Sequence, residues 1–192
     1  MTRYTGINHL AMATSDMEAT VRFWRDLLGM RLVAGIGHPG YRHYFLEISE
    51  TDMIAFFEWP GVKPVEPKDH GVPVKGPFVF DHISFGVAGR DDLWELKAKL
   101  EGAGFWASEV IDHGFILSLY SFDPNNIAIE FSWPQPGIDL RSHPRLVDRH
   151  PPRVRLEGSE PQPGRWPDPE PPRPEDKRIY PGEGREILGF ED

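Results

Sequence analysis

Two histidines and two glutamates recur at nearly equal spacing along this chain of 192 residues. His9 precedes Glu58 by 49 positions, and His82 precedes Glu130 by 48. The short segments around the histidines are alike, Asn-His-Leu-Ala in the first copy and Asp-His-Ile-Ser in the second. Imidazole and carboxylate groups are common metal ligands. A duplicated unit that carries one of each on its strands could bring four ligands together, so the spacing predicts a metalloprotein.

Three of these residues carry the strongest signal. Alternation along a strand gives His9, His82 and Glu130 small or polar neighbours on their own face. Glu130 also interrupts an apolar run, where an unpaired carboxylate would be costly to bury. Two imidazoles and one carboxylate leave coordination positions open for a substrate. Ligand type alone accommodates Fe(II), Mn(II), Ni(II) or Zn(II).

The elements that must position these residues form two similar modules, at residues 5–59 and 78–133. Hydrophobic periodicity predicts a strand, a helix and three strands in each. In the first module the strands are expected at 6–13, 31–34, 41–48 and 53–59, and a capping box of Ser15 with Glu18 begins the helix. In the second module we expect strands at 81–87, 106–111, 115–122 and 127–133, with a helix around 93–100. The fold class is therefore α+β, with paired βαβββ modules.

Proline content separates the rest of the chain from these modules. Residues 60–77 are rich in proline and glycine and read as a linker, and 13 of the 20 prolines follow from Pro134 onward. Proline excludes regular helix and central strand, so residues 134–192 are expected to form an irregular arm. Two interpretations stay open: a surface-draped or partly disordered tail, and an arm that wraps over the site or a neighbouring subunit. Its candidate anchors are Trp166, Tyr180, Ile187, Leu188 and Phe190.

Composition excludes several classes of function. The chain has no cysteine, which excludes disulfides, thiolate metal sites and cysteine nucleophiles. Its net charge is −9 and no basic stripe is present, which argues against a nucleic-acid partner. No apolar run is long enough to span a membrane, and the N-terminus lacks the apolar stretch of a secretory signal. A cytoplasmic location is the default expectation.

Together these residues resemble the vicinal oxygen chelate superfamily. Its members include glyoxalase I, extradiol ring-cleaving dioxygenases, methylmalonyl-CoA epimerase, and fosfomycin- and bleomycin-resistance proteins. The resemblance covers residues 5–133 and implies a cup-shaped mixed sheet around a divalent metal. His9, His82 and Glu130 fall at the family's common ligand positions, and Glu58 matches a fourth position that glyoxalase I fills with Glu.

Residues 111–130 resemble the pattern of extradiol dioxygenases most closely. The matching positions are His113, Leu119, Tyr120, Asp123, Pro124 and Glu130. The departure is Asn126, where the pattern has Gly or Pro, and Asn tolerates the left-handed conformation that Gly usually supplies there.

The resemblance also implies roles for these residues. His9, His82 and Glu130 would bind Fe(II), Tyr120 would hydrogen-bond the substrate, and His113 would support the site from outside the ligand set. Those enzymes carry a further acid–base histidine near the end of the preceding module. There this chain offers Glu58, with His43 and His70 as substitutes.

Three functions follow as hypotheses. The first is Fe(II)-dependent extradiol cleavage of a catechol-type small molecule. The second is a lyase or isomerase of glyoxalase or epimerase type, with four ligands that include Glu58. The third is a drug-sequestering protein that performs no catalysis, with aromatic side chains lining the cup (Trp24, Trp59, Phe78, Phe80 and Trp106). We also expect a homo-oligomer, with the site either inside one chain or shared between two.

Overall fold

The computed structural model describes residues 7, 9–50, 52–75, 80–140, 142–143, 156 and 170–189. Trp166 and Phe190, two of the expected arm anchors, lie outside these residues, as does Phe78. The chain divides into two units, one of Met1–Gln135 with Gly184–Asp192 and one of Pro136–Glu183. The predicted domain boundaries stay predictions.

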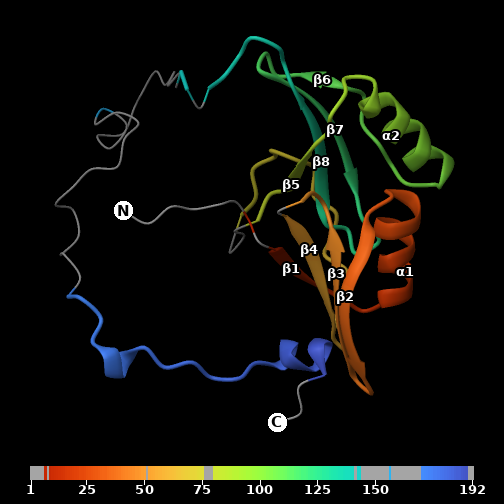
Figure 1. Cartoon of the computed structure of the whole chain (residues 1–192). Helices are drawn as coiled ribbons and strands as arrows, with labels where there is room; N and C mark the ends of the chain where they lie inside the picture. Colours follow the sequence, from red (N-terminus) through yellow and green to blue (C-terminus); the bar gives the residue numbers. More distant parts are fainter. Residues whose placement is uncertain are drawn as a thin grey trace. The chain divides into compact units, whose positions relative to one another are not determined.

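Two modules of similar element order make up most of the first unit (Figure 1). The first contains β1 (His9–Thr14), α1 (Met17–Val21), a π-helical continuation η1 (Arg22–Leu27), β2 (Arg31–His38), β3 (Tyr41–Glu47) and β4 (Met53–Glu58). The second contains β5 (Ile83–Gly86), α2 (Asp92–Gly102), β6 (Ile111–Asp112), β7 (Ile116–Phe122) and β8 (Ala128–Pro134). This order confirms the predicted α+β class with two βαβββ modules.

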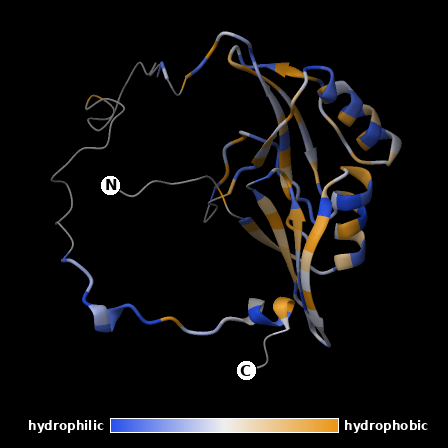
Figure 2. Cartoon of the chain, viewed as in Figure 1, coloured by the Kyte–Doolittle hydropathy of each residue, from blue (hydrophilic) through white to orange (hydrophobic). Residues whose placement is uncertain are grey.

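Each module forms a four-stranded mixed sheet. The strand orders are β1-β4-β3-β2 and β5-β8-β7-β6, so the first and last strands of each module lie side by side and pair in parallel. Both helices lie on the same side of the sheets (Figure 1). Figure 2 colours each helix with hydrophilic and hydrophobic segments, as expected for helices that bury one face. The opposite faces of the two sheets are therefore available to carry a site.

The two modules share one apolar core beneath the helices. It includes Trp24 and Phe56 from the first module and Leu93, Leu119 and Ile129 from the second. The Trp24 side chain is fully buried. The expectation that it lines a cup is therefore wrong, because its helical spacing turns it toward this core.

The first helix begins one residue later than predicted. Asp16 has an extended conformation, and its Oδ1 accepts a hydrogen bond from the Ala19 N–H at 2.9 Å. Asp16 is therefore the N-cap, and the predicted capping box of Ser15 with Glu18 is wrong. Glu18 instead pairs with Arg22 one turn later, at 2.9 Å. Gly29, with φ of 81°, follows the end of the helical segment, as its position predicts.

The predicted strand at 106–111 is largely absent. Only Ile111 and Asp112 pair regularly with β7, and Ala107 forms an isolated bridge with Ser121. Between them, the Ser108 hydroxyl accepts the Tyr120 N–H at 2.9 Å. A side chain thus takes the place of a backbone partner, which interrupts the regular ladder.

A buried polar network joins the first module to the turn between β7 and β8. The Thr14 hydroxyl donates to Asn125 Oδ1 at 2.8 Å, and the Trp24 indole N–H donates to Asp123 Oδ2 at 3.3 Å. Asn126, in the same turn, has φ of 60° and is the one non-glycine residue with positive φ in the described part of the chain. The expected left-handed conformation at this position is confirmed.

The described part of the arm contains short 3-10 turns, η3 (Pro174–Asp176) and η4 (Glu183–Leu188). The side chains of Tyr180, Ile187 and Leu188 are exposed. That they anchor the arm stays a prediction. No helix in the described residues is long and apolar enough to cross a membrane.

Candidate metal centre

Strand register relates the two modules residue by residue. In the first sheet Ala11, two residues after His9, pairs with Ala55; in the second, Ser84, two residues after His82, pairs with Glu130. The position that corresponds to Glu130 is therefore Ala55. Glu58 lies three residues further on, and because side chains alternate along a strand it projects to the opposite face. The predicted equivalence of Glu58 with Glu130 is wrong.

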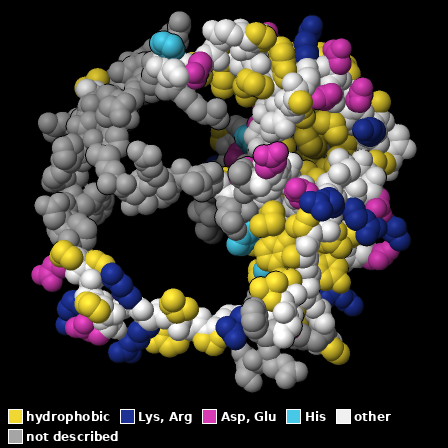
Figure 3. Space-filling view, in the orientation of Figure 1, with side chains coloured by type: hydrophobic (Ala, Val, Ile, Leu, Met, Phe, Trp, Pro, Cys, Tyr) yellow, Lys and Arg dark blue, Asp and Glu magenta, His cyan; other side chains and the backbone are white. Residues whose placement is uncertain are grey.

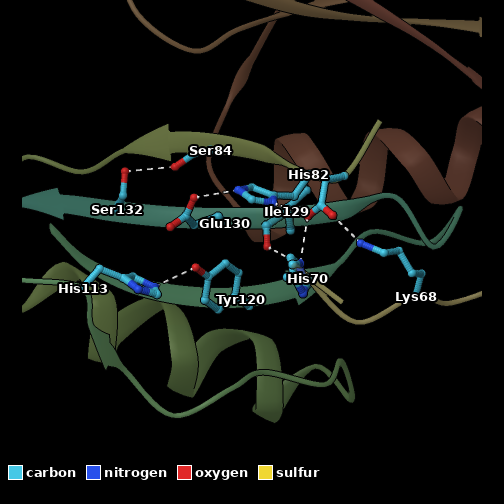
Figure 4. Close-up of polar contacts among 11 residues, drawn as sticks. Lys68, His70, His82, Ser84, His113, Tyr120, Ile129, Glu130 and Ser132 are labelled. Carbon is cyan, nitrogen blue, oxygen red and sulfur yellow. Dashed lines mark hydrogen bonds and ion pairs between the residues drawn. The ribbon is translucent and has the colours of Figure 1, made fainter. Parts of the chain in front are cut away.

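His82 and Glu130 meet on the face of the second sheet that lies away from the helices. The Nε2 atom of His82 is 3.1 Å from Glu130 Oε2 (Figure 4). The other ring nitrogen, Nδ1, is 2.7 Å from Asp81 Oδ1. With its proton hydrogen-bonded to this carboxylate, Nδ1 would leave the Nε2 lone pair to a metal, as in metal-binding histidines.

Glu130 is a buried carboxylate in a polar surrounding. Only 4% of the Glu130 surface is exposed to solvent. Burial alone would raise the pKa of Glu130, but the hydroxyls of Ser118 and Ser84 and the nearby His82 imidazole hold it below its ordinary value. The carboxylate is therefore ionised at neutral pH and suited to a cation.

Tyr120 on β7 and His113 in the turn between β6 and β7 border this pair. Tyr120 pairs with Glu130 across the strands, and its hydroxyl is 2.9 Å from His113 Nε2 (Figure 4). Burial and the charge of Glu130 raise the pKa of Tyr120. Its phenol therefore stays protonated at neutral pH and remains a hydrogen-bond donor.

The linker contributes His70 to the same face. The centroid of its ring is 4.5 Å from that of Tyr120 and 5.8 Å from that of His82, and its Nε2 is 3.0 Å from the Ile129 carbonyl oxygen. Burial lowers the pKa of His70, so the ring is neutral at physiological pH. His43, the other substitute named from the sequence, stacks on Phe57 in the first sheet at 3.6 Å.

Asp81 holds the linker against the segment that carries His82. Besides His82, its carboxylate accepts hydrogen bonds from the Gly71 N–H at 3.0 Å and from the Lys68 ammonium group. Lys68, His82 and Gly71 together hold the pKa of Asp81 well below its usual range. Asp81 is not among the residues predicted from the sequence, although an acidic residue directly before a candidate ligand histidine indicates a partner for its imidazole.

Glu58 lies in a different environment, on the helix side of the first sheet. Its Oε1 accepts the Met17 N–H at 2.9 Å, and its other oxygen pairs with Arg42 on β3. A carboxylate that accepts the first N–H of a helix stabilises the helix N-terminus. The structure thus gives Glu58 a structural position, away from His82 and Glu130.

His9 lies on the first sheet, where hydrophobic side chains gather in the space-filling view (Figure 3). Its ring contacts Phe45 edge-on at 5.5 Å. Among the described residues, no three His, Cys, Asp or Glu side chains are grouped closely enough to hold a metal ion. The structure brings His82 and Glu130 together but does not add His9 to them.

Comparison with known proteins places this arrangement in a family. Residues 6–131 match the family described as the Glyoxalase/Bleomycin resistance protein/Dioxygenase superfamily. The chain belongs to this superfamily. The frame of paired modules around His82 and Glu130 is therefore that of the superfamily, and the predicted resemblance is confirmed.

Relatives within the superfamily differ in chemistry. The chain is 28% identical to the iron-dependent extradiol dioxygenase of Rhodococcus jostii over 131 residues, 66% of this chain and 42% of the dioxygenase. It is 25% identical to the lactoylglutathione lyase of Haemophilus influenzae over 130 residues, 65% of this chain and 90% of the lyase. The chain thus spans less than half of the dioxygenase that it matches.

A solved superfamily structure supports the fold. A glyoxylase/bleomycin resistance protein/dioxygenase domain from Frankia sp. superposes with a TM-score of 0.58 and 21% identity, covering 69% of this chain and all of that one. At this identity the likeness concerns the fold alone.

Proposed function

We propose that this chain is a metal-dependent enzyme that opens the ring of a catechol-type substrate with dioxygen. The observation that carries the proposal is the position of His70 beside Tyr120 and His82. From sequence alone the place of the acid–base histidine of an extradiol enzyme fell to Glu58, with His43 and His70 as substitutes. A neutral imidazole within the same group of side chains supplies that role.

His82 and Glu130 have the chemistry of metal ligands. The Nε2 atom of His82 lies 3.1 Å from the buried carboxylate of Glu130. Asp81 contacts the other ring nitrogen of His82 and fixes the orientation of the imidazole. This donor set fits a divalent metal, and Fe(II) is the one that the proposed reaction uses. When bound, the metal would supply the electron transfer between the substrate and dioxygen.

The remaining residues handle protons and position the substrate. His70 is neutral and accepts the proton that a catechol hydroxyl loses when its oxygen binds. Tyr120 keeps its proton and donates a hydrogen bond to a substrate oxygen, while His113 holds the Tyr120 hydroxyl in place. In the net reaction the carbon–carbon bond beside the two hydroxyl-bearing carbons breaks. Both oxygen atoms of dioxygen enter the product, so no external reductant is needed.

The glyoxalase-type alternative has less support from the geometry. It requires four metal ligands that include Glu58, with Glu58 or Glu130 as the base that removes a proton beside a carbonyl. The Glu58 carboxylate is instead held by the Met17 N–H and Arg42 on the helix side of the sheet.

The third ligand in this proposal is His9, from the same chain or from a second copy of it. Mixing a His9→Ala chain with a Glu130→Ala chain distinguishes the two sources. Activity that recovers on mixing indicates a site shared by two chains, and no recovery indicates a site within one. If His9→Ala retains full metal affinity, His9 is not a ligand.

The function is tested by loading the protein anaerobically with Fe(II) and adding a 3-substituted catechol and then air. We expect a coloured ring-fission product, and its loss in His70→Ala but not in the matched variant His43→Ala. Failure to form colour with any catechol, while iron is bound in stoichiometric amount, contradicts the proposal.

A further inference from the structure

Trp106 is a large aromatic side chain that stays 54% exposed. Its backbone is fixed, because the Ser121 hydroxyl donates to the Trp106 carbonyl oxygen at 2.7 Å. The next residue, Ala107, bridges to Ser121 and packs against the core. Alternation therefore turns Trp106 to the other face, the one that carries Tyr120 and Phe122.

Ring contacts connect Trp106 to the candidate site. Its ring lies 6.4 Å from that of His70, with 21° between the planes, and 5.7 Å from that of Phe122. His70 in turn contacts Tyr120. Aromatic rings thus continue from the ligand His82, through Tyr120 and His70, to Trp106.

This series changes in polarity along its length. At one end are the ionised Glu130 and its imidazole neighbour, which suit a chelating polar group. At the other end are Trp106, whose side chain is exposed, and Phe122, whose ring it contacts. An exposed indole held by its backbone offers a ready surface on which a flat apolar group can stack.

We propose that Trp106 is a specificity-determining residue that selects substrates with a bulky apolar or aromatic group attached to the chelating ring. The proposal rests on the proposed function for the chelating end of the site. The substrate would be bipartite: its two neighbouring oxygens lie toward His82 and Glu130, and its apolar group stacks on Trp106. A small unsubstituted catechol would leave the indole exposed and would not benefit from it.

The test compares catechol with 3-phenylcatechol in the wild type and in Trp106→Ala, Trp106→Phe and Trp94→Ala. Trp94 is the matched control, because it is also exposed (43%) but lies on α2, where Arg90 packs over its ring. Binding is measured anaerobically by calorimetry on the metal-loaded protein, and turnover is measured in air. Binding thereby gives a readout that does not depend on ring cleavage.

We expect Trp106→Ala to weaken 3-phenylcatechol binding at least about tenfold and to raise its KM, with kcat nearly unchanged. Catechol binding should stay within about twofold, Trp106→Phe should restore part of the affinity, and Trp94→Ala should resemble the wild type. Equal losses for both ligands, an unchanged ratio, or no binding of 3-phenylcatechol to the wild type would overturn the inference. Selective binding without any turnover would reject the proposed function and leave the role of Trp106 standing.

Discussion

Glu58 and Glu130 lie on equivalent last strands of the two modules, yet they project to opposite faces of their sheets. Glu130 lies beside His82 at 3.1 Å, whereas Glu58 accepts the first N–H of α1. The near repeat in sequence therefore duplicates the fold but not the arrangement of the candidate ligands. The candidate site is concentrated in the second module and the linker.

The first prediction follows from this difference. Glu130→Gln should lower metal affinity by more than about 100-fold, since even the loss of a supporting partner costs 10- to 100-fold. Glu58→Gln should leave metal affinity within about twofold but lower the free energy of unfolding by about 1 kcal/mol, because it weakens the interaction at the helix N-terminus. Chelator competition and urea unfolding measure the two effects. A large loss of metal affinity in Glu58→Gln would return Glu58 to the ligand set.

Asp81 should act as a positioning residue for His82. Asp81→Asn should weaken metal binding by about 10- to 100-fold, because an amide orients the imidazole less strongly. Asp69→Asn, one residue before His70, serves as the control and should have no such effect. Asp81→Glu should recover part of the affinity. If Asp81→Asn binds metal as tightly as the wild type, the carboxylate does not orient the ligand.

The stability of the protein should respond to pH through Asp123. Burial raises the pKa of this carboxyl, so the folded protein keeps a proton that the unfolded chain releases. Its contribution is present below the ordinary value of 3.8 and is lost as pH rises through the native pKa. The difference in unfolding free energy between wild type and Asp123→Asn should therefore fall as pH rises above 3.8.

Asp26 provides a comparison of opposite sign. Hydrogen bonds from Arg25 and Arg22 lower its pKa to about 2. Its stabilising contribution is present above 3.8 and is lost as pH falls toward about 2. Unfolding of wild type, Asp123→Asn and Asp26→Asn from a pH of about 2 to well above 3.8 measures both slopes. If the pH dependence has the same sign in both variants, the raised pKa of Asp123 is contradicted.

The bond between Thr14 and Asn125 should connect the stability of the two modules. Thr14→Val keeps the shape of the side chain but leaves the buried Asn125 Oδ1 without its 2.8 Å donor. We expect a loss of about 1–3 kcal/mol in urea unfolding, the usual cost of an unsatisfied buried polar group. Ser15→Ala, at the exposed position next to Thr14, is the control. A Thr14→Val protein as stable as Ser15→Ala would exclude this role.

Local sequence patterns predicted the elements well where periodicity is strong. The strands around His82 and Glu130, the glycine after the first helix and the left-handed Asn126 all follow from side-chain alternation and turn chemistry. The N-cap at Asp16 was missed because Ser15 and Asp16 are both good caps, and only the backbone conformation distinguishes them.

The composition of the candidate site was harder to predict for a physical reason. Spacing along the sequence does not fix strand register, and a shift of one residue reverses the face of a side chain. Spacing therefore predicts Glu58 as the counterpart of Glu130, although the strand register puts Ala55 at the corresponding position. His70 and Asp81 lie in or next to an irregular linker, where no periodicity indicates which side chains approach the sheet.

The most direct test of the central claim is to follow the oxygen atoms. Fe(II)-loaded protein is supplied with 3-phenylcatechol under isotopically heavy dioxygen, and the product is analysed by mass spectrometry. The account predicts a ring-opened product whose new carboxylate carries the heavy isotope, formed by the wild type and not by His82→Ala or Glu130→Gln. Ring-opened product without the isotope, or no product from protein that holds its iron, would contradict it.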